Sequence, residues 1–441
     1  AERRFCVKRA IIIGAGISGL AAGWWLHKKF PQAEILVLDK EAYAGGFVRT
    51  ESPQGFSFDL GPKGFLTRGD GEYTLKLIHE LGLQNSLIFS DRAAKNRFVY
   101  YRGKAHKIST WTLLRKGLLP SLIKDFRAPC YTQDSSVQDF LKRHSSQNFT
   151  SYILDPLITA IRAGHSSILS THMAFPELAK REASSGSLLR SYLKNRSPKK
   201  SKTDRYLASL SPSMGTLITT IQEKLPATWK FSTSVTHIDC SPKEACVTTP
   251  SETFFADMVI YTGPLQQLPV LLPNYGIENL SKRVLPWNLS SISLGWHHAN
   301  FSLPKGYGML FADELPLLGI VWNSQIFPQA TPGKTVLSLL IEGKWRESEA
   351  HAFAIAALSE YLNINQKPDA FALFSSQDGM PQHAVGFLER KERILPHLPG
   401  NLKIVGQNIA GPGLNRCIAS AYHAICDLHT EETLAQPQSS L

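Results

Sequence analysis

The sequence is poor in cysteine and, after its N-terminal part, has no long apolar run. Six cysteines stand scattered through 441 residues, without a Cys-x-x-Cys pair. This spacing argues against a disulfide scaffold, so we expect a reducing compartment and no bound metal. No later segment has the length and purity of a membrane-spanning helix. Zinc-finger spacing and aromatic–basic RNA motifs are also missing, so we expect no nucleic-acid partner.

What is present is an ordinary globular composition with an excess of positive charge. Hydrophobic residues make up 43% and charged residues 19% of a chain that is long enough for two or three domains. The formal net charge of +12 favours anionic partners such as acidic lipid or a polycarboxylate substrate. The basic run at residues 198–202 is interpreted as a solvated linker.

Residues 9–20 predict a strand, a glycine turn and the start of a helix. Gly14 permits the tight turn, Gly16 lets the backbone approach a pyrophosphate, and Gly19 allows the helix to pack on the strand. A second strand-like run ends at Asp39, where an acid accepts hydrogen bonds from ribose hydroxyls and disfavours a 2′-phosphate. The order of these parts predicts a dinucleotide site at the N-terminus.

A secretory signal is the competing interpretation of the same segment. Residues 10–26 are almost wholly apolar and follow several basic residues, and Ala1 in place of Met leaves processing open. The run is short for a membrane span, however, and its glycines fall at phosphate-loop spacing. We therefore favour the nucleotide interpretation.

Periodicity divides the remaining chain into helical and strand-like parts. A helix is predicted over residues 70–83, and residues 136–195 look helical throughout. Strand-like runs occur at residues 56–62, 230–239, 256–264, 289–297, 319–323 and 335–341. The chain closes with a strand at residues 401–406, a glycine turn and a helix from about Leu414. This order predicts a return to the nucleotide domain.

Residues 111–127 interleave leucines with basic side chains. Such a segment is suited to a membrane interface, with its apolar face down and its cations near anionic headgroups. Pro120 limits it to two short helices or one kinked helix. A surface helix that packs on its own domain remains the alternative.

Several segments, taken in order, resemble the FAD-dependent porphyrinogen oxidases within the amine oxidase and phytoene desaturase superfamily. They are residues 13–22, 45–50, 60–62, 136–143, 163–164, 175–176, 186–188, 213–217, 319–324, 327–328, 380–382 and 406–421. The chain departs from the family pattern at several positions. Tyr43 and Ala44 precede the glycine pair, His383 and Phe387 replace common residues, and Arg416 stands in place of an acid.

The resemblance implies an α/β fold in three parts. A Rossmann-like FAD-binding domain would be assembled from discontinuous segments, with an α+β substrate domain and a mostly helical insertion domain. The implied boundaries are 1–90, 206–265 and 386–441 for the FAD-binding domain, 91–205 for the helical membrane-binding insertion, and 266–385 for the substrate domain.

The resemblance also implies the site residues. The positions expected to contact FAD are Gly14, Gly16, Ser18, Gly19, Asp39, Lys40, Gly45, Gly46, Gly61, Pro62, Val235, Gly406, Gly413, Leu414 and Ile418. The positions expected to contact the substrate are Gly164, Tyr307, Leu310 and Leu340. Arg68 and the neighbouring Lys63 are cations suited to a substrate propionate, with a solvated loop as the alternative.

The implied reaction removes hydride from a meso carbon and then a proton from a pyrrole nitrogen, three times in succession, with oxygen reoxidising the flavin. No catalytic acid–base pair is expected, because the redox chemistry belongs to the cofactor. His165, His297, His298 and His383 are therefore interpreted as structural residues, and Cys417 as a packing residue.

The expected activity is oxidation of protoporphyrinogen IX to protoporphyrin IX, with hydrogen peroxide release, in haem biosynthesis. We expect a cytoplasmic protein attached peripherally to the inner face of a membrane, and a homodimer is left open. Oxidation of coproporphyrinogen III is one alternative. Others are an amine oxidase or carotenoid desaturase on the same scaffold, and a non-catalytic FAD-binding protein.

Overall fold

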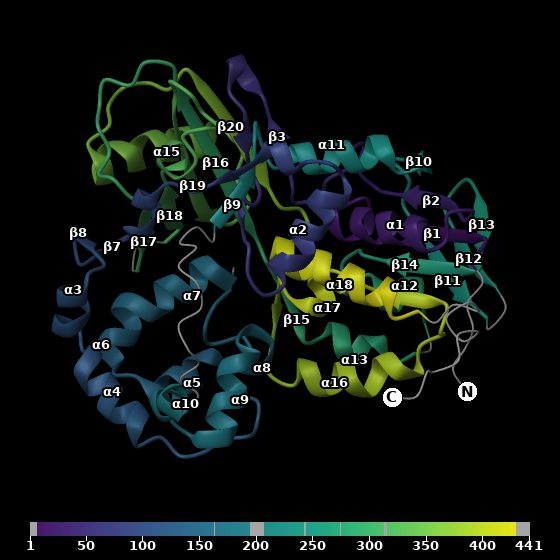
Figure 1. The fold of residues 1–441 in the computed structure, drawn as a ribbon, viewed down its shortest axis with the longest axis horizontal. Helices are drawn as coiled ribbons and strands as arrows, with labels where there is room; N and C mark the ends of the chain where they lie inside the picture. The colour runs from purple at the N-terminus through teal and green to yellow at the C-terminus, as the bar shows by residue number, and fades with distance from the viewer. Residues whose placement is uncertain are drawn as a thin grey trace, which may run out of the picture.

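The computed structural model describes residues 7–162, 164–194, 207–241, 244–273, 275–312 and 315–428. Figure 1 shows two β-sheet regions and a group of helices beside them. The basic run at residues 198–202 lies outside the described residues. Among the described helices, none is long and apolar enough to cross a membrane.

The first region is built on a five-stranded parallel sheet whose strands come from distant parts of the chain. Their spatial order is β10 (Ala227–Lys230), β2 (Glu34–Leu38), β1 (Arg9–Ile13), β14 (Met258–Tyr261) and β22 (Leu402–Ile404). After its first residue, β1 carries buried apolar residues on both of its faces, as expected for a strand that is covered on both sides. This sheet confirms the predicted assembly from discontinuous segments.

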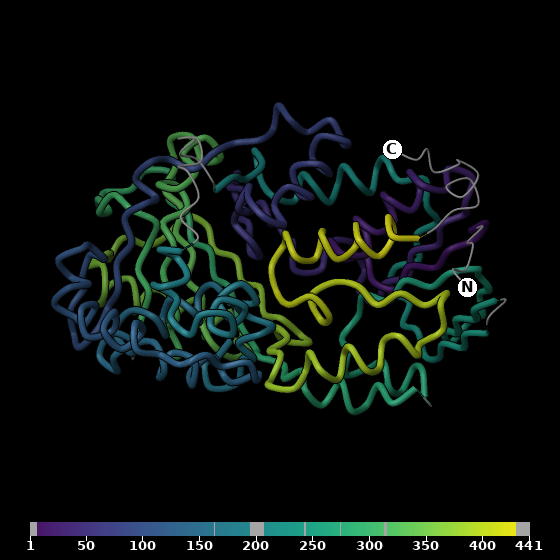
Figure 2. Tube along the Cα trace, turned by 60° about the horizontal axis from the view of Figure 1, so that its bottom comes forward, coloured from purple at the N-terminus to yellow at the C-terminus, as the bar shows by residue number. Residues whose placement is uncertain are grey.

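Helices cover one face of the parallel sheet, and a second layer covers the other. On the first face lie α1 (Ile17–Lys29), α2 (Gly71–Glu80), α11 (Gly215–Lys224) and α18 (Leu414–Cys426), which share one hydrophobic core with the strands. Figure 2 shows the C-terminal α18 beside the N-terminal segment, and Trp25 of α1 meets Tyr422 of α18 with ring centroids 5.0 Å apart. The opposite face packs on a small antiparallel sheet of β11 (His237–Cys240), β12 (Ala245–Thr248) and β13 (Thr253–Ala256).

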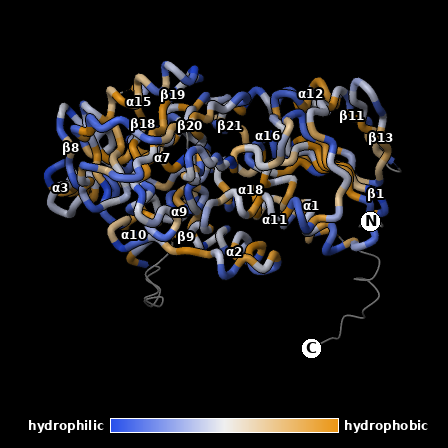
Figure 3. The backbone as a smooth tube through the Cα atoms, turned by 90° about the horizontal axis from the view of Figure 1, so that it is seen from above, coloured by the Kyte–Doolittle hydropathy of each residue, from blue (hydrophilic) through white to orange (hydrophobic). Residues whose placement is uncertain are grey.

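The second region is a seven-stranded sheet. Its order is β20 (Ala370–Ser375), β16 (Leu289–Trp296), β19 (Thr335–Glu342), β18 (Leu317–Val321), β17 (Gly308–Phe311), β7 (Phe98–Tyr101) and β8 (Lys104–Lys107). The helix α15 (Glu347–Leu362) covers one face and shares its core with the strands. Figure 3 shows hydrophobic segments gathered in two groups, one around β1 and one around β18 and β20.

The third region is helical. It contains α3 (Thr110–Arg115), α4 (Leu118–Phe126), α5 (Val137–His144), α6 (Gln147–Phe149), a π-helical turn (Thr150–Leu154), α7 (Asp155–Arg162), α8 (Thr171–Ala174), α9 (Pro176–Ser185) and α10 (Leu188–Lys194). Residues 98–107, which the predicted insertion included, instead add β7 and β8 to the seven-stranded sheet. The boundaries of the predicted domains stay a prediction.

The break in the segment 111–127 lies at Gly117 and not at Pro120. Gly117 has a φ of +103°, which favours glycine, and it separates α3 from α4. Pro120 sits in the first turn of α4, where its missing N–H has no intrahelical partner to lose. The expectation of two short helices is confirmed, but the residue that separates them was predicted wrongly.

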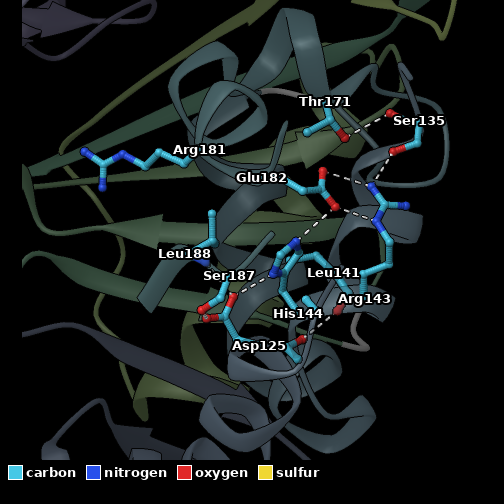
Figure 4. Close-up of polar contacts among 12 residues, drawn as sticks. Asp125, Ser135, Leu141, Arg143, His144, Thr171, Arg181, Glu182, Ser187 and Leu188 are labelled. Carbon is cyan, nitrogen blue, oxygen red and sulfur yellow. Dashed lines mark hydrogen bonds and ion pairs between the residues drawn. The ribbon is translucent and has the colours of Figure 1, made fainter. Parts of the chain in front are cut away.

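A buried charge network ties four elements of the helical region together (Figure 4). Asp125 of α4 accepts from His144 Nδ1 at 2.6 Å, and Glu182 of α9 accepts from His144 Nε2 at 3.0 Å. Arg143 donates from Nε to Glu182 at 2.5 Å, and Ser187 donates to Asp125 at 2.7 Å. Both ring nitrogens of His144 therefore face carboxylate oxygens, and Arg143 supplies a cation to the same buried cluster.

Most predicted strands are present, and two were predicted wrongly. The runs at 289–297, 319–323 and 335–341 correspond to β16, β18 and β19. Residues 231–236 lie in the middle of a predicted strand, but they connect β10 to β11 without strand pairing. Their backbone bonds the loop after β2 instead, since the Ser232 N–H donates to the Glu41 carbonyl at 2.9 Å. Of residues 56–62 only β4 (Phe58–Asp59) is a strand.

Candidate functional site

The glycine turn after β1 is shaped by contacts that exclude side chains. Gly14 has a φ of +107° and donates its N–H to the Leu38 carbonyl at 2.8 Å. A Cβ on Gly14 would lie 2.2 Å from Thr262 Oγ1, and one on Gly19 only 1.9 Å from the Gly14 carbonyl oxygen. The turn therefore delivers the N-terminus of α1, with its free N–H groups, to the edge of the sheet.

A second backbone strip, the loop with Gly45 and Gly46, lies against this turn. Gly45 donates its N–H to the Ala15 carbonyl at 2.9 Å and forms a β-bridge with Gly16. A Cβ on Gly46 would lie 3.2 Å from Gly16 Cα, whereas a Cβ on Gly16 would meet nothing closer than 3.9 Å. Two backbone strips without side chains thus form a cradle that fits a diphosphate.

Asp39 ends β2 beside the cradle. Its carboxylate accepts the Ala15 N–H at 2.6 Å and the Glu41 N–H at 2.8 Å. Asp39 therefore braces the glycine turn, and its oxygens retain lone pairs for a ribose hydroxyl. Val235 follows a turn whose backbone binds Asp39 (Thr233 N to Asp39 O, 2.8 Å). The neighbouring Lys40 instead pairs with Asp378 at 2.7 Å on the surface.

The C-terminal turn joins the N-terminal one. A Cβ on Gly406 would lie 2.5 Å from Ser18 Oγ, and the Gly406 N–H donates to Ser420 Oγ at 3.1 Å. Gly413, with a φ of +126°, precedes α18, and Leu414 and Ile418 are buried in its first turns. Cys417 is buried beside Ser18, and burial raises its pKa to about 11. It remains a thiol, in keeping with a packing role.

Gly61 and Pro62 follow β4 and pack on the loop after Gly46. A Cβ on Gly61 would lie 1.7 Å from the Phe47 carbonyl oxygen. Lys63, which we expected to be suited to a substrate propionate, donates to the Asp59 backbone carbonyl, and burial lowers its pKa to about 8. Arg68 is exposed in the loop before α2. The glycine-lined strips and the buried turns around Ser18 have the backbone donors and the small residues that an FAD site needs.

Two of the predicted substrate residues share one face of the seven-stranded sheet. Leu310 of β17 pairs with Gly319 of β18, which pairs with Leu340 of β19. Residues directly opposite in antiparallel strands point to the same face, and this row continues through Ser291 to Phe374. The row lies on the face opposite α15, because the neighbouring residues of each strand form the α15 core.

This face points toward the nucleotide cradle. The Phe374 ring meets the edge of Phe47, the residue after Gly46, with centroids 6.0 Å apart. Gly319 leaves the centre of the row without a side chain between two leucines. Leu310 and Leu340, with Gly319 between them, therefore form an apolar wall on this face, suited to a broad ring system.

Gly164 and Tyr307 lie at the borders of this wall. Gly164 is buried after α7, and a Cβ there would lie 3.0 Å from Gln382 Oε1, which accepts the His165 N–H at 2.7 Å. Tyr307 directly precedes β17, and its N–H donates to the Asn96 carbonyl at 2.8 Å. Because α7 packs on β17 and β18, Gly164, which follows α7, lies near the row of Leu310, Gly319 and Leu340.

Sequence reasoning missed Arg97. Its guanidinium carbon lies 5.3 Å from the centroid of the Tyr307 ring, and Val99, two residues further along β7, pairs with Leu310. Arg97 thus places a cation at the border of the apolar wall. No motif marks it, because its position depends on the parallel pairing of β7 with β17.

The histidines have structural contacts. His383 Nε2 bonds the Asn408 carbonyl at 2.8 Å, and burial lowers the pKa of His383 to about 4, so the ring is neutral. His165 stacks on Trp287 with ring centroids 4.5 Å apart. Within the described residues, no group of three or more His, Cys, Asp or Glu side chains is placed to hold a metal.

Comparisons with known proteins agree with this geometry. A family model for flavin containing amine oxidoreductases matches residues 17–382. A coproporphyrinogen III oxidase of Bacillus subtilis (strain 168) is 24% identical over 470 residues, which cover 96% of this chain and 98% of that protein. A protoporphyrinogen oxidase of Bos taurus is 25% identical over 473 residues, which cover 95% and 97%.

Solved structures share the fold. A "Putative protoporphyrinogen oxidase" from Exiguobacterium sp. 255-15 superposes with a TM-score of 0.81 at 21% identity, covering 95% of this chain and 98% of that one. A triple mutant of putrescine oxidase superposes with a TM-score of 0.72 at 15% identity, again covering 95% and 98%. These similarities extend over both sheets and the helical region.

Proposed function

Because this chain belongs to the flavin-containing amine oxidoreductase family and is an FAD-dependent oxidoreductase, we propose that it oxidises a porphyrinogen in haem biosynthesis. The apolar wall of Leu310, Gly319 and Leu340, which faces the dinucleotide cradle, carries this proposal. A broad tetrapyrrole needs an apolar surface of that kind beside the flavin. The names of the bacterial and bovine relatives, both porphyrinogen oxidases, support the same substrate class.

The proposed substrate is protoporphyrinogen IX, with coproporphyrinogen III as the alternative. Six electrons and six protons leave the substrate, and three oxygen molecules become three molecules of hydrogen peroxide. Bound FAD supplies the redox chemistry by accepting two electrons at a time. The chain itself then has to orient the ring and exclude water, which accounts for a site of apolar and glycine residues.

We assign FAD binding to the predicted residues around the two glycine turns. Gly16 and Gly46 would leave room for the diphosphate, Asp39 would bind the ribose, and Ser18 and Gly406 lie where the two turns meet. Lys40 would act through its ion pair with Asp378 and not through direct contact. Tyr307 and Gly164 would border the ring, and Arg97 or Arg68 would pair with one propionate.

An anaerobic mixing experiment tests the proposal. The FAD-loaded protein is mixed with protoporphyrinogen IX or coproporphyrinogen III, and flavin absorbance and porphyrin fluorescence are followed together. We expect the flavin to bleach as fluorescence appears, and the faster substrate identifies the natural one. Absence of bleaching with both substrates would contradict a porphyrinogen oxidase. Bleaching by putrescine or benzylamine alone would favour an amine oxidase. If none of these substrates bleaches the flavin, the result would favour a non-catalytic flavoprotein.

We also propose peripheral membrane attachment through the exposed face of α3 and α4. Six large apolar side chains are exposed there, namely Trp111, Leu114, Leu119, Leu122, Ile123 and Phe126. They alternate with Arg115, Lys116, Lys124 and Arg127. A groove of about 420 Å³ between α4 and residues 128–129 adds to this surface. Apolar side chains among cations suit the interface of an anionic bilayer.

Replacing Trp111 and Ile123 by serine is expected to abolish flotation with anionic vesicles. These side chains are 68% and 55% exposed, and burying each in lipid contributes about 1.5–3 kcal/mol, so the double variant should partition at least about 100-fold less. Val270→Ser, at a site 76% exposed on α12 (Leu268–Leu271), is the matched control. Wild-type protein that stays at the bottom of the gradient would refute attachment.

A further inference from the structure

Two arginines from distant parts of the chain meet at the end of α8. Arg416, in the first turn of α18, donates from Nη1 to the Met173 carbonyl at 3.1 Å and from Nη2 to the Ala174 carbonyl at 3.2 Å. Arg162, the last residue of α7, places its guanidinium carbon 4.7 Å from the centroid of the Phe175 ring. Both side chains therefore converge on residues 173–175.

Among the described residues, no close acidic side chain balances the guanidinium charges of Arg162 and Arg416. Burial lowers the pKa of Arg162 to about 10, and the Arg416 charge adds to that effect, while Asp70 opposes it. Burial also lowers the pKa of Arg416, again opposed by Asp70. Among the described residues neither guanidinium forms an ion pair, so two cations share one more distant acid.

Arg162 also carries an unused donor. Its Nε is buried and has no hydrogen-bond partner within the described part of the chain. A buried N–H without an acceptor is unfavourable, and more so on a cation. A bound anion would satisfy the donor and balance the charge in one step.

The pair lies where the proposed substrate and flavin residues meet. Arg162 is two residues before Gly164, and Arg416 shares the first turns of α18 with Leu414 and Ile418. The planar donors of a guanidinium match the two oxygens of a carboxylate.

We infer that Arg162 and Arg416 form a carboxylate subsite that holds one propionate of the tetrapyrrole. This inference rests on the proposed porphyrinogen oxidase function and adds to it a second anchoring point. Arg97, beside Tyr307 on the seven-stranded sheet, is a separate cation on a different element. If Arg97 holds one propionate and the pair of Arg162 and Arg416 holds the other, the ring cannot rotate in its own plane above the flavin. An apolar wall alone would not prevent this rotation.

Arg162→Gln tests the subsite with free and esterified substrate. We expect the KM for protoporphyrinogen IX to rise about 10-fold while kcat changes less than twofold, and Arg162→Lys to recover part of the loss. Protoporphyrinogen IX dimethyl ester lacks the carboxylates, so its KM should be the same in wild type and variant. Arg181→Gln is the matched control, since this exposed arginine of α9 points away from the buried network (Figure 4).

A binding measurement separates the subsite from the reaction. Protoporphyrin IX and its dimethyl ester are titrated into the FAD-loaded protein, and quenching of tryptophan fluorescence gives both dissociation constants. Wild type should prefer the free acid about 10-fold, and Arg162→Gln should lose this preference. An unchanged preference would overturn the subsite. Loss of FAD or a shifted flavin spectrum in Arg162→Gln would also overturn it, because the pair would then hold the cofactor.

The two proposals fail in different ways. If wild type oxidises neither porphyrinogen but still prefers the free acid of protoporphyrin IX through Arg162, the oxidase function fails and the carboxylate subsite stands. If it oxidises porphyrinogen while Arg162→Gln leaves every constant unchanged, the subsite fails and the function stands.

Discussion

Substitution of Gly16 by alanine is expected to lower FAD affinity about 100-fold without unfolding the protein. A Cβ at this position meets nothing closer than Gly46 Cα at 3.9 Å, and the φ of Gly16 is −71°, which any residue adopts. The methyl group would instead project from the backbone surface of the cradle to which we assign the diphosphate. Losing two charge-assisted hydrogen bonds of about 1.5 kcal/mol each corresponds to that factor.

Gly19→Ala is the instructive comparison, because there the added Cβ would lie 1.9 Å from a backbone oxygen. We expect Gly19→Ala to lower both the melting temperature of the apoprotein and its FAD affinity. Titration of apoprotein with FAD, followed by flavin fluorescence, and melting by circular dichroism separate the two effects. If Gly16→Ala binds FAD with unchanged affinity, the diphosphate does not bind in this cradle and our assignment is wrong.

Glu182→Ala should destabilise the helical region by about 3–5 kcal/mol. The substitution leaves the Arg143 cation and the His144 Nε2 atom without the carboxylate that they share, and removing one partner of a buried charge network carries a cost of this size. Urea denaturation monitored by circular dichroism and limited proteolysis of α4 measure it. Glu177→Ala is the matched control on the same helix, since Glu177 is 75% exposed and pairs only with Lys180.

Acid should weaken the same network. Burial raises the pKa of Asp125 and of Glu182, but hydrogen bonds outweigh it, so the pKa of each acid lies below its ordinary value. Asp125 accepts from Leu189 N–H, Ser187 and His144, and Glu182 accepts from His144 and Arg143. A lowered pKa in the folded state stabilises the fold above the unfolded pKa and loses this contribution as the pH falls through the folded pKa. Below about pH 4, wild type and Glu182→Ala should therefore converge in stability. A constant difference across that range would contradict the network.

The parts of the site that depend on local sequence were predictable, and the parts that depend on tertiary packing were not. Gly14, Gly19 and Asp39 lie within one strand–turn–helix–strand unit, so their spacing was sufficient. The pairing of Leu310 with Gly319 requires the register of the sheet, which no short pattern encodes. Resemblance to a family supplied Leu310 and Leu340, but not the glycine between them.

Charged contacts across the chain were the least predictable. Asp125 and His144 are 19 residues apart, and Arg162 and Arg416 are brought together only by the docking of α18 beside α8. The division of residues 111–127 shows a subtler limit. Proline was the obvious breaker, yet the first turn of a helix accepts it, and the left-handed φ of Gly117 ends the preceding helix instead.

The meeting of Ser18 with Gly406 also has a consequence for the order of events during protein synthesis. The two residues touch in the cofactor site, but a ribosome reaches the second only after joining the 388 residues that follow the first. At about 5–20 residues per second this takes about 20–80 s. Throughout that interval the nascent chain carries half a flavin site, with the face of α1 that α18 later covers still bare. Cofactor loading is therefore a post-translational event, and a chain terminated before α18 would be a target for chaperones or proteases.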